Sequence, residues 1–162
     1  MPGCSLQDAG RTGRLHEGIA ASGPLVPFLH DAVRASLDLG PADAVLEVLL
    51  HPVTLLVESD GVLSVDGRLV RAAAGDTVRV DPGRRSAAYV GVPGGFDVPL
   101  VLGSRSTLPG AGVGGLEGRF LRAGDVLEAR LAHPATERDV DVAPPDARTP
   151  IEVVPGPDRF PE

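Results

Sequence analysis

The sequence predicts a mainly β domain with one principal helix. Hydrophobic residues make up 43% of the chain, and Val and Leu recur in short runs bounded by turn residues, a pattern typical of many short strands. One segment, at about residues 24–38, instead repeats its apolar side chains at helical spacing. The 21 Gly and 16 Pro residues would by themselves suggest disorder, but the apolar runs favour a folded domain.

The helix expected at 24–38 rests on the spacing of its apolar residues and on the residues at its two ends. Ser22 is a candidate N-terminal cap, and Gly40-Pro41 ends the run. The simplest interpretation of the apolar stripe is that it packs into the core. Its members are Leu25, Phe28, Leu29, Ala32, Ser36 and Leu39.

Residues 1–23 are Gly-rich and are expected to be irregular, whereas most of the remaining chain is expected to form strands. Asp66-Gly67 lies between two apolar segments and predicts a tight hairpin. Gly-Asp turns recur at residues 75–76 and 124–125, each expected to lead into a strand. The expected strands lie at 44–50, 53–58, 62–65, 68–70, 77–80, 87–92, 98–102, 126–131 and 151–154.

Composition divides the chain into three parts. Residues 1–132 hold the helix and most strands and are expected to form a first subdomain. Residues 133–150 are rich in Pro, Asp, Thr and Ala and indicate a linker or surface loop. Residues 151–162 would then open a second, truncated subdomain.

The charge and residue usage exclude several functions. The formal net charge is −7, so nucleic acid is not an expected partner. All fifteen basic residues are Arg, so the chain cannot carry biotin on a lysine, form a lysine Schiff base or build a P-loop lysine. Cys4 is the one cysteine. With no signal-peptide pattern and no apolar run of about 20 residues, a cytoplasmic location without a membrane span is expected.

Two motifs that would suggest a cofactor lack the context they need. Gly110, Gly112 and Gly115 match G-x-G-x-x-G, but further glycines follow where a dinucleotide-binding motif requires a helix. The four histidines do not share metal-ligand spacing. We therefore expect neither a dinucleotide nor a metal.

Three polar, glycine-bearing clusters are the candidate functional residues. The sequence Gly-Ser-Arg-Ser-Thr at residues 103–107 is either an exposed turn or an anion site, in which Arg105 offers a planar fork for a carboxylate. Residues 114–119 and 7–11 are the other two clusters. If the three form a site, the fold must bring them together, with Arg11, Arg105 and Arg119 facing one cleft.

The same three clusters carry a resemblance to a known family. Gln-Asp-Ala-Gly-Arg at residues 7–11, the continuous stretch 94–107, Gly-Gly-Leu-Glu-Gly-Arg at 114–119 and Leu-Arg-Ala-Gly-Asp at 121–125 follow that family's order and spacing. The chain resembles the first half of the carboxyltransferase-like family that includes allophanate hydrolase subunit 2, the carboxyltransferase domain of urea amidolyase and the C subunits of bacterial 5-oxoprolinases. It departs from the family at Val26, where an acidic residue is usual, and at Val33, where an Asn is usual.

The resemblance implies a cyclophilin-like β-barrel half-domain, and it implies two alternative functions. In the first, the chain is a subunit of a complex that hydrolyses 5-oxoproline to glutamate with ATP, or of a related carboxyltransferase acting on urea-like substrates. In the second, it is a catalytically inactive binding or regulatory module, akin to relatives that antagonise a kinase inhibitor. These two alternatives leave open whether the chain is an enzyme.

The resemblance also implies partners, cofactors and site residues. Partners would be the other subunits or a second copy, and ATP or carboxybiotin would come from partner subunits. The substrate would be a small carboxylate or amide. No catalytic residue is assigned. The candidate substrate-binding residues are Arg11, Ser104, Arg105, Ser106, Thr107, Glu117 and Arg119, and the candidate positioning residues are Gln7, Asp8, Gly94, Gly95, Gly114 and Gly115.

Overall fold

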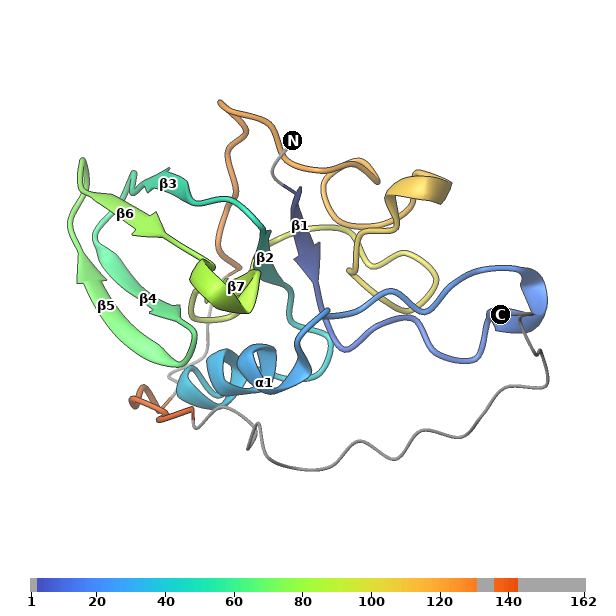
Figure 1. Ribbon diagram of the computed structural model, residues 1–162, viewed down its shortest axis with the longest axis horizontal. Helices are drawn as coiled ribbons and strands as arrows, with labels where there is room; N and C mark the ends of the chain where they lie inside the picture. Colours follow the sequence, from blue (N-terminus) through green and yellow to red (C-terminus); the bar gives the residue numbers. More distant parts are fainter. Residues whose placement is uncertain (1–2, 131–135, 143–162) are drawn as a thin grey trace, which may run out of the picture.

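The computed structural model describes residues 3–130 and 136–142. Over these residues the chain forms two antiparallel sheets and one α-helix, α1 (Pro27–Ser36) (Figure 1), which confirms the predicted mainly β fold with one principal helix. The five-stranded sheet has the order β1-β2-β7-β4-β5, and the two-stranded sheet pairs β3 with β6. The strands are β1 (Gly3–Gln7), β2 (Val45–Leu49), β3 (Val53–Leu56), β4 (Gly61–Val65), β5 (Arg68–Ala72), β6 (Thr77–Val80) and β7 (Ala87–Gly91).

The hairpin predicted from Asp66-Gly67 is confirmed. Residues 61–65 of β4 pair in register with residues 68–72 of β5, and the two turn residues have φ angles of +50° and +90°. Positive φ at both central positions is the geometry that Asp-Gly favours in a two-residue hairpin. The turn is also attached to the sheet, because the Asp66 carboxylate accepts a hydrogen bond of 2.8 Å from the backbone N–H of Tyr89.

Helix α1 is shorter than predicted and begins differently. Val26 is its N-cap residue and Pro27 is its first residue, with no side-chain cap, so the expected capping role of Ser22 is wrong. Ser22 lies four residues earlier, with a φ of +57°. The backbone N–H groups of Leu25 and Val26 instead donate to Glu47 of β2 and to Tyr89 of β7.

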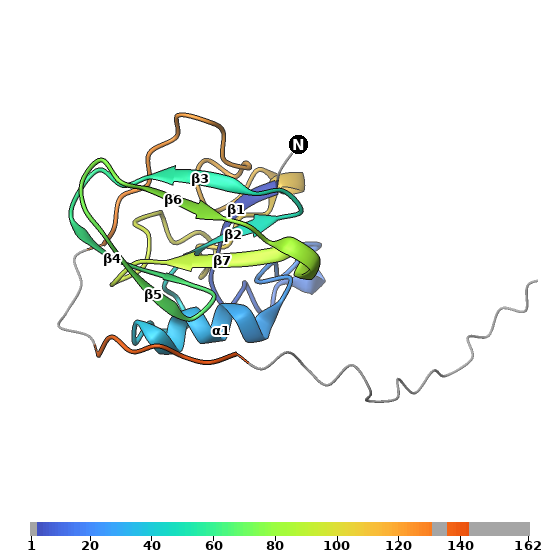
Figure 2. The same cartoon turned by 60° about the vertical axis from the view of Figure 1, so that its left-hand side comes forward.

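Two apolar layers lie on opposite faces of the five-stranded sheet. On one face α1 packs through Leu29, Val33 and Leu37, as Figure 2 shows. The approach is close: a Cβ added at Gly91 would lie 2.5 Å from Val33. The other face is covered by β3, β6 and the segment of residues 92–130. The residues buried there are Cys4, Leu6, Ala44, Leu46, Val48, Leu63, Val80, Ala88, Val90, Phe96 and Val98.

Two predicted strands are wrong. Residues 98–100 are irregular, and residues 102–103 form a turn closed by an isolated bridge between Val101 and Ser104. Pro99 has no N–H to donate to a ladder, and both Leu100 and Leu102 are exposed. Residues 126–131 were also expected to be a strand, but the described part forms only a single bridge, from Ala129 to Phe96.

Strand β1 was missed, because residues 1–23 were expected to be irregular. Its outer edge is covered by the chain that follows β7: the backbone N–H of Thr107 donates to the carbonyl of Leu6, and that of Leu121 to the carbonyl of Cys4, each at 2.8 Å. Among the described strands, the pairing does not close into a barrel.

Residues 136–142 lie along the end of α1 and the β4–β5 turn. The backbone N–H of Arg138 donates to Ser36, and that of Val140 donates to Gly67. The predicted linker, residues 133–150, is therefore described only in part, and the strand expected at 151–154 lies outside the described residues. No helix in the described part of the chain is long and apolar enough to cross a membrane.

Candidate functional site

The three polar clusters meet beside the end of β1, as a site would require. Residues 103–107 lie against β1 through Thr107, whose hydroxyl accepts from the N–H of Leu6 and donates to its carbonyl. The third cluster joins at Gly115, whose N–H donates to the carbonyl of Arg105 at 2.9 Å. Gly114 passes so close that a Cβ there would lie 2.8 Å from a nitrogen of Arg11. We call this meeting point the junction.

Asp8 is the anion at the centre of the junction. Its side chain is almost fully buried and accepts hydrogen bonds from the hydroxyls of Ser104 (2.6 Å) and Ser106 (2.7 Å). The backbone N–H groups of Arg105 (2.6 Å) and Gly10 (2.9 Å) also donate to it. Residues 103–107 were predicted to be either an exposed turn or an anion site. Their hydroxyl and N–H donors bind a carboxylate of the protein itself, that of Asp8.

These bonds decide the protonation state of Asp8. Burial alone would raise its pKa, because a charge is disfavoured away from water. The donors from Ser104, Arg105, Ser106 and Gly10 outweigh burial and hold the pKa of Asp8 below its ordinary value. The carboxylate therefore stays ionised at neutral pH.

Arg11 lies on the other side of the same loop and is 1% exposed. Its Nε donates to the carbonyl of Val101 (3.1 Å), and one terminal nitrogen donates to the carbonyl of Ser106 (2.9 Å). Its other terminal nitrogen, Nη1, is buried and has no hydrogen-bond partner among the described residues. Ser106 thus stands between the two buried charges, its hydroxyl bound to Asp8 and its carbonyl to Arg11.

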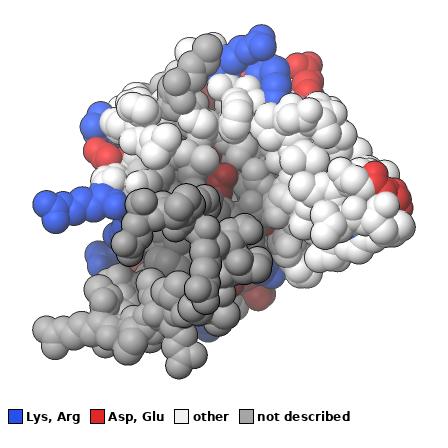
Figure 3. Space-filling model, turned by 45° about the vertical axis from the view of Figure 1, so that its right-hand side comes forward, with Lys and Arg blue, Asp and Glu red and all other residues white. Residues whose placement is uncertain are grey.

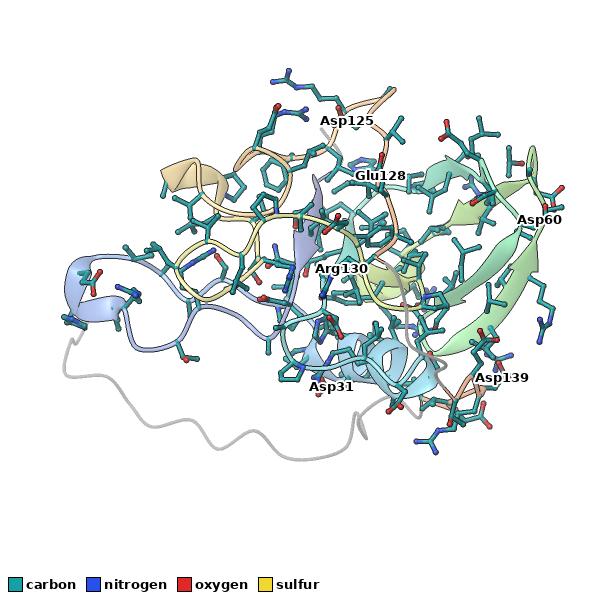
Figure 4. All side chains as sticks on the ribbon, turned by 180° about the vertical axis from the view of Figure 1, so that it is seen from behind. Asp31, Asp60, Asp125, Glu128, Arg130 and Asp139 are labelled. Carbon is teal, nitrogen blue, oxygen red and sulfur yellow. The ribbon has the colours of Figure 1, made fainter. Side chains whose placement is uncertain are left out.

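The guanidinium groups of Arg105 and Arg119 both donate hydrogen bonds to other groups of the protein, and their partners differ. Arg105 donates to the backbone carbonyls of Val98 (2.9 Å) and Ala42 (2.7 Å). Arg119 makes a two-pronged contact with Asp125, at 2.7 and 3.0 Å, on the outer loop seen in Figure 4. The hydrogen bonds from Arg119 lower the pKa of Asp125 to about 2.

The remaining candidate residues occupy positions around the junction. Gln7 bridges Ser5, Thr107 and the N–H of Gly23, and so fixes the path of the chain between β1 and α1. Glu117 is largely exposed and pairs with Arg119 at 3.1 Å. Gly94 and Gly95 form a tight turn, both with positive φ.

That turn lies beside the loop that receives Arg105. A Cβ added at Gly95 would come within 3.0 Å of the carbonyl of Ala44. The N–H of Arg130 donates to the carbonyl of Gly95, and its side chain pairs with Asp43 at 2.7 Å. Figure 4 labels Arg130 and Glu128 on this part of the chain.

A second buried polar cluster was not predicted. Glu47 on β2 is 4% exposed and accepts from the hydroxyl of Tyr89 (2.6 Å), the N–H of Leu25 (2.8 Å) and the hydroxyl of Ser5 (3.3 Å). Burial and the bond to Glu47 raise the pKa of Tyr89. One signal was present in the sequence: Glu47 interrupts an otherwise apolar strand, where a charge needs a buried partner.

His30 of α1 borders this second cluster. Its ring is 1% exposed and packs edge-on against Tyr89, with ring centroids 5.8 Å apart. Its Nε2 is buried and has no hydrogen-bond partner within residues 3–130 and 136–142. Burial lowers the pKa of His30, although the neighbouring Asp31 opposes this, so the ring is neutral at neutral pH.

Similar solved structures define the class of the domain. The chain resembles the Kluyveromyces lactis urea amidolyase with a TM-score of 0.74 and 28% identity, over 85% of this chain and 10% of that one. The K. lactis urea carboxylase gives a TM-score of 0.72 and 30% identity, over 77% of this chain and 13% of that one. The fold is that of a β-rich domain found within the much larger chains of a urea amidolyase and a urea carboxylase.

Sequence comparison then gives the family. A family model described as "Carboxyltransferase domain, subdomain A and B" matches residues 17–161, and the chain belongs to this family. The 5-oxoprolinase C subunit of Escherichia coli (strain K12) is 36% identical over 142 residues, covering 76% of this chain and 45% of that protein. The Haemophilus influenzae C subunit is 31% identical, covering 93% of this chain and 54% of that protein. The chain thus spans about half the length of these relatives.

Proposed function

We propose that the chain acts as a subunit of a 5-oxoprolinase-like complex, which hydrolyses 5-oxoproline to glutamate with ATP. The observation that carries this proposal is the similarity to two 5-oxoprolinase C subunits, one of which covers 93% of this chain. ATP is supplied through the partner subunits in this proposal, and the substrate is a small carboxylate or amide.

The junction defines what the chain contributes. Every hydroxyl of residues 104–107 is bound internally, to Asp8 or Leu6, so these residues hold loops in place rather than presenting free donors. Carboxybiotin supplied by a partner subunit would meet the same constraint, because the junction's anion-binding groups are bound to Asp8. The proposal therefore includes no chemical step on carboxybiotin.

The experiment is reconstitution with the partner subunits. The purified chain is combined with the other two subunits of a 5-oxoprolinase, and ATP hydrolysis is measured with and without 5-oxoproline. We expect 5-oxoproline-dependent hydrolysis that requires the chain. Stimulation by urea instead would assign the chain to the urea-carboxylating branch, and no change on adding the chain would contradict an active role.

A second candidate is the catalytically inactive binding or regulatory module. The observation that favours it is the internal use of the junction's donors by Asp8, which leaves that carboxylate where a substrate carboxylate was expected. In this case the chain would bind its partner subunits and change their activity without contributing to turnover.

A further inference from the structure

One described segment is fixed to the domain without being buried in it. Residues 136–142, here called the strap, lie along the end of α1 and the β4–β5 turn, and Figure 2 draws them in orange-red beside the helix. Val140 and Val142 are half-buried, whereas the other five residues of the strap are exposed. The strap therefore lies on the surface of the domain in the way a bound peptide would.

Hydrogen bonds at successive residues hold the strap in place. The backbone N–H of Arg138 donates to the carbonyl of the last residue of α1 at 2.9 Å, and that of Val140 donates to the carbonyl of Gly67 at 2.8 Å. Between these two, the Asp139 carboxylate accepts a hydrogen bond of 2.8 Å from the N–H of Leu69. Figure 4 labels Asp139 at this place.

The strap covers an edge of the larger sheet. Strand β5 is the last in the order β1-β2-β7-β4-β5, so its outer side has no further strand among the described residues. The strap binds the N–H of Leu69 on that edge and the carbonyl of Gly67 in the turn before it. Because an open sheet edge pairs readily with another chain, we expect the uncovered groove between α1 and β5 to bind a replacement segment.

Two valines and two aspartates give the strap its fit. Val140 passes so close to Gly67 that a Cβ added there would lie 2.8 Å from the Val140 carbonyl oxygen. Val142 packs against the apolar cluster between α1 and the sheet. Asp141 lies 3.7 Å from a guanidinium nitrogen of Arg68. The groove thus fits a segment in which acidic residues alternate with valines.

These contacts are specific but few. Segments with few buried apolar contacts open locally at a small cost in free energy, and an ion pair as exposed as that of Arg68 and Asp141 adds little. Each contact joins the strap to the groove. The same contacts would form if the strap came from another molecule.

We propose that the groove binds the strap of a second copy of this chain, so that two copies exchange their straps. Each copy carries one groove and one strap, so reciprocal exchange forms every contact twice and closes a symmetric dimer. Within one molecule, tethering gives the strap an effective concentration on the order of 1 mM, so the exchanged dimer forms at high protein concentration. This inference goes beyond the proposed function and does not depend on catalysis.

The fit of the strap, and not a general attraction of charges, would select the second copy. The formal net charge of −7 makes two copies repel each other. On the face shown in Figure 3, the described basic and acidic side chains lie scattered on a largely uncharged surface. The test is therefore run at about 0.15 M salt, where repulsion between exposed charges is screened beyond about 8 Å.

Mixed single-cysteine variants test the exchange. Arg68→Cys in one chain and Asp141→Cys in a second chain, which carries a size tag, are mixed at about 1 mM and treated with a bifunctional maleimide. Both native side chains are largely exposed, and the native Cys4 is buried. We expect a mixed cross-linked dimer on a denaturing gel, because exchange places position 68 of one copy beside position 141 of the other.

A strap variant gives the second measurement. Val140→Asp, added to the chain that carries Asp141→Cys, would place a charge against Gly67 and Ala32, where the groove is closely packed. We expect at least about a tenfold loss of the mixed dimer, while circular dichroism shows that the domain still folds.

Glu58→Cys is the matched control for Asp141→Cys. Glu58 is also an exposed acidic residue, and it lies before β4, at the other end of the hairpin from Gly67. Mixed with Arg68→Cys, it should give only background cross-linking. A mixed dimer no more abundant than in this control, or one that survives Val140→Asp, would overturn the proposal. So would a strap displaced only by added partner subunits, seen as faster hydrogen exchange at Val140, because the occupant would then be another polypeptide.

Discussion

Asp8 and Glu47 are both buried carboxylates without a salt bridge among the described residues, but they hold different parts of the molecule together. Asp8 is bound by four donors from two loops, two of them hydroxyls at 2.6 and 2.7 Å. Glu47 lies on a central strand, and its three donors come from β1, β7 and the segment before α1. A buried ion is tolerated when hydrogen bonds replace its hydration, and the chain achieves this once between loops and once between strands and helix.

The two carboxylates also differ in the kind of donors that they bind. Glu47 and Tyr89 accept the backbone N–H groups of Leu25 and Val26, directly before α1, and so fix the chain where the helix begins. Asp8 replaces an external anion at a loop that otherwise has the composition of an anion site. Removing Asp8 should therefore free a set of donors, whereas removing Glu47 should loosen a helix.

The largest expected effect is that of Asp8→Ala. It leaves the hydroxyls of Ser104 and Ser106 and the backbone N–H groups of Arg105 and Gly10 without their acceptor. We expect a loss of about 3–5 kcal/mol in the free energy of unfolding, because each buried donor that is left unsatisfied costs about 1–3 kcal/mol. Urea denaturation measures this. A loss below about 1 kcal/mol would show that the junction rearranges easily without Asp8. It would contradict the role of Asp8 in holding these loops together.

A smaller effect is expected for Tyr89→Phe. The variant keeps the ring but removes the hydroxyl that donates to Glu47 at 2.6 Å and accepts from Val26 at 2.9 Å. Hydrogen bonds to charged groups contribute about 1.5–3 kcal/mol, and we expect a loss in that range. Hydrogen exchange should locate the change in the first turn of α1, while the amides of residues 104–107 keep their protection; equal loss of protection in both places would argue against separate roles.

Two serines test the comparison most directly. Ser104→Ala removes a donor 2.6 Å from Asp8, and Ser5→Ala removes one 3.3 Å from Glu47. Because short bonds to a carboxylate are the stronger ones, we expect about 1.5–3 kcal/mol for Ser104→Ala and about 0.5–1 kcal/mol for Ser5→Ala. The reverse order in thermal or urea unfolding would contradict the roles that these distances indicate.

The pH dependence of stability should show two separate declines. The pKa of His30 is lowered in the folded protein, so its contribution is complete above the unfolded value of about 6.5 and is lost as the pH falls toward the folded value. The pKa of Asp8 is also lowered, so its contribution is lost only below about pH 4.

Single variants assign the two declines. His30→Phe should remove the decline that begins near pH 6.5, and Asp8→Asn should remove the one at lower pH, both followed by urea midpoints between about pH 3 and 8. If the upper decline survives in the His30 variant, another group causes it.

The sequence predicted the elements whose signals are local. The Asp-Gly turn requires only its own two residues, and α1 shows its apolar spacing within one segment. Residues 98–102 and 126–131 were mistaken for strands because apolar composition does not reveal whether a neighbouring strand is available. Strand β1 was missed for the opposite reason: Gly-Cys-Ser-Leu-Gln has no β-branched residue, and its strand conformation depends on pairing with β2 and Thr107.

The sequence predicted which residues make up the junction, but it did not predict their hydrogen-bond partners. The polar clusters were recognised and do meet, but the partner of each charge depends on tertiary geometry. Arg105 and Arg119 were expected to face a cleft with Arg11, and their guanidinium groups bind backbone carbonyls and Asp125 instead. Whether any of the candidate residues binds substrate stays a prediction.

The bonds of Asp8 also bear on the order of events during synthesis. Its hydroxyl donors lie 96 and 98 residues further along the chain. A ribosome adds about 5–20 residues per second, so roughly 5–20 s separate the emergence of the carboxylate from that of its partners. Strand β1 cannot complete its environment in that interval, and the domain therefore folds after most of it has been made rather than progressively from its amino terminus. A circular permutant beginning near residue 92 would make the donors first and should shorten that wait.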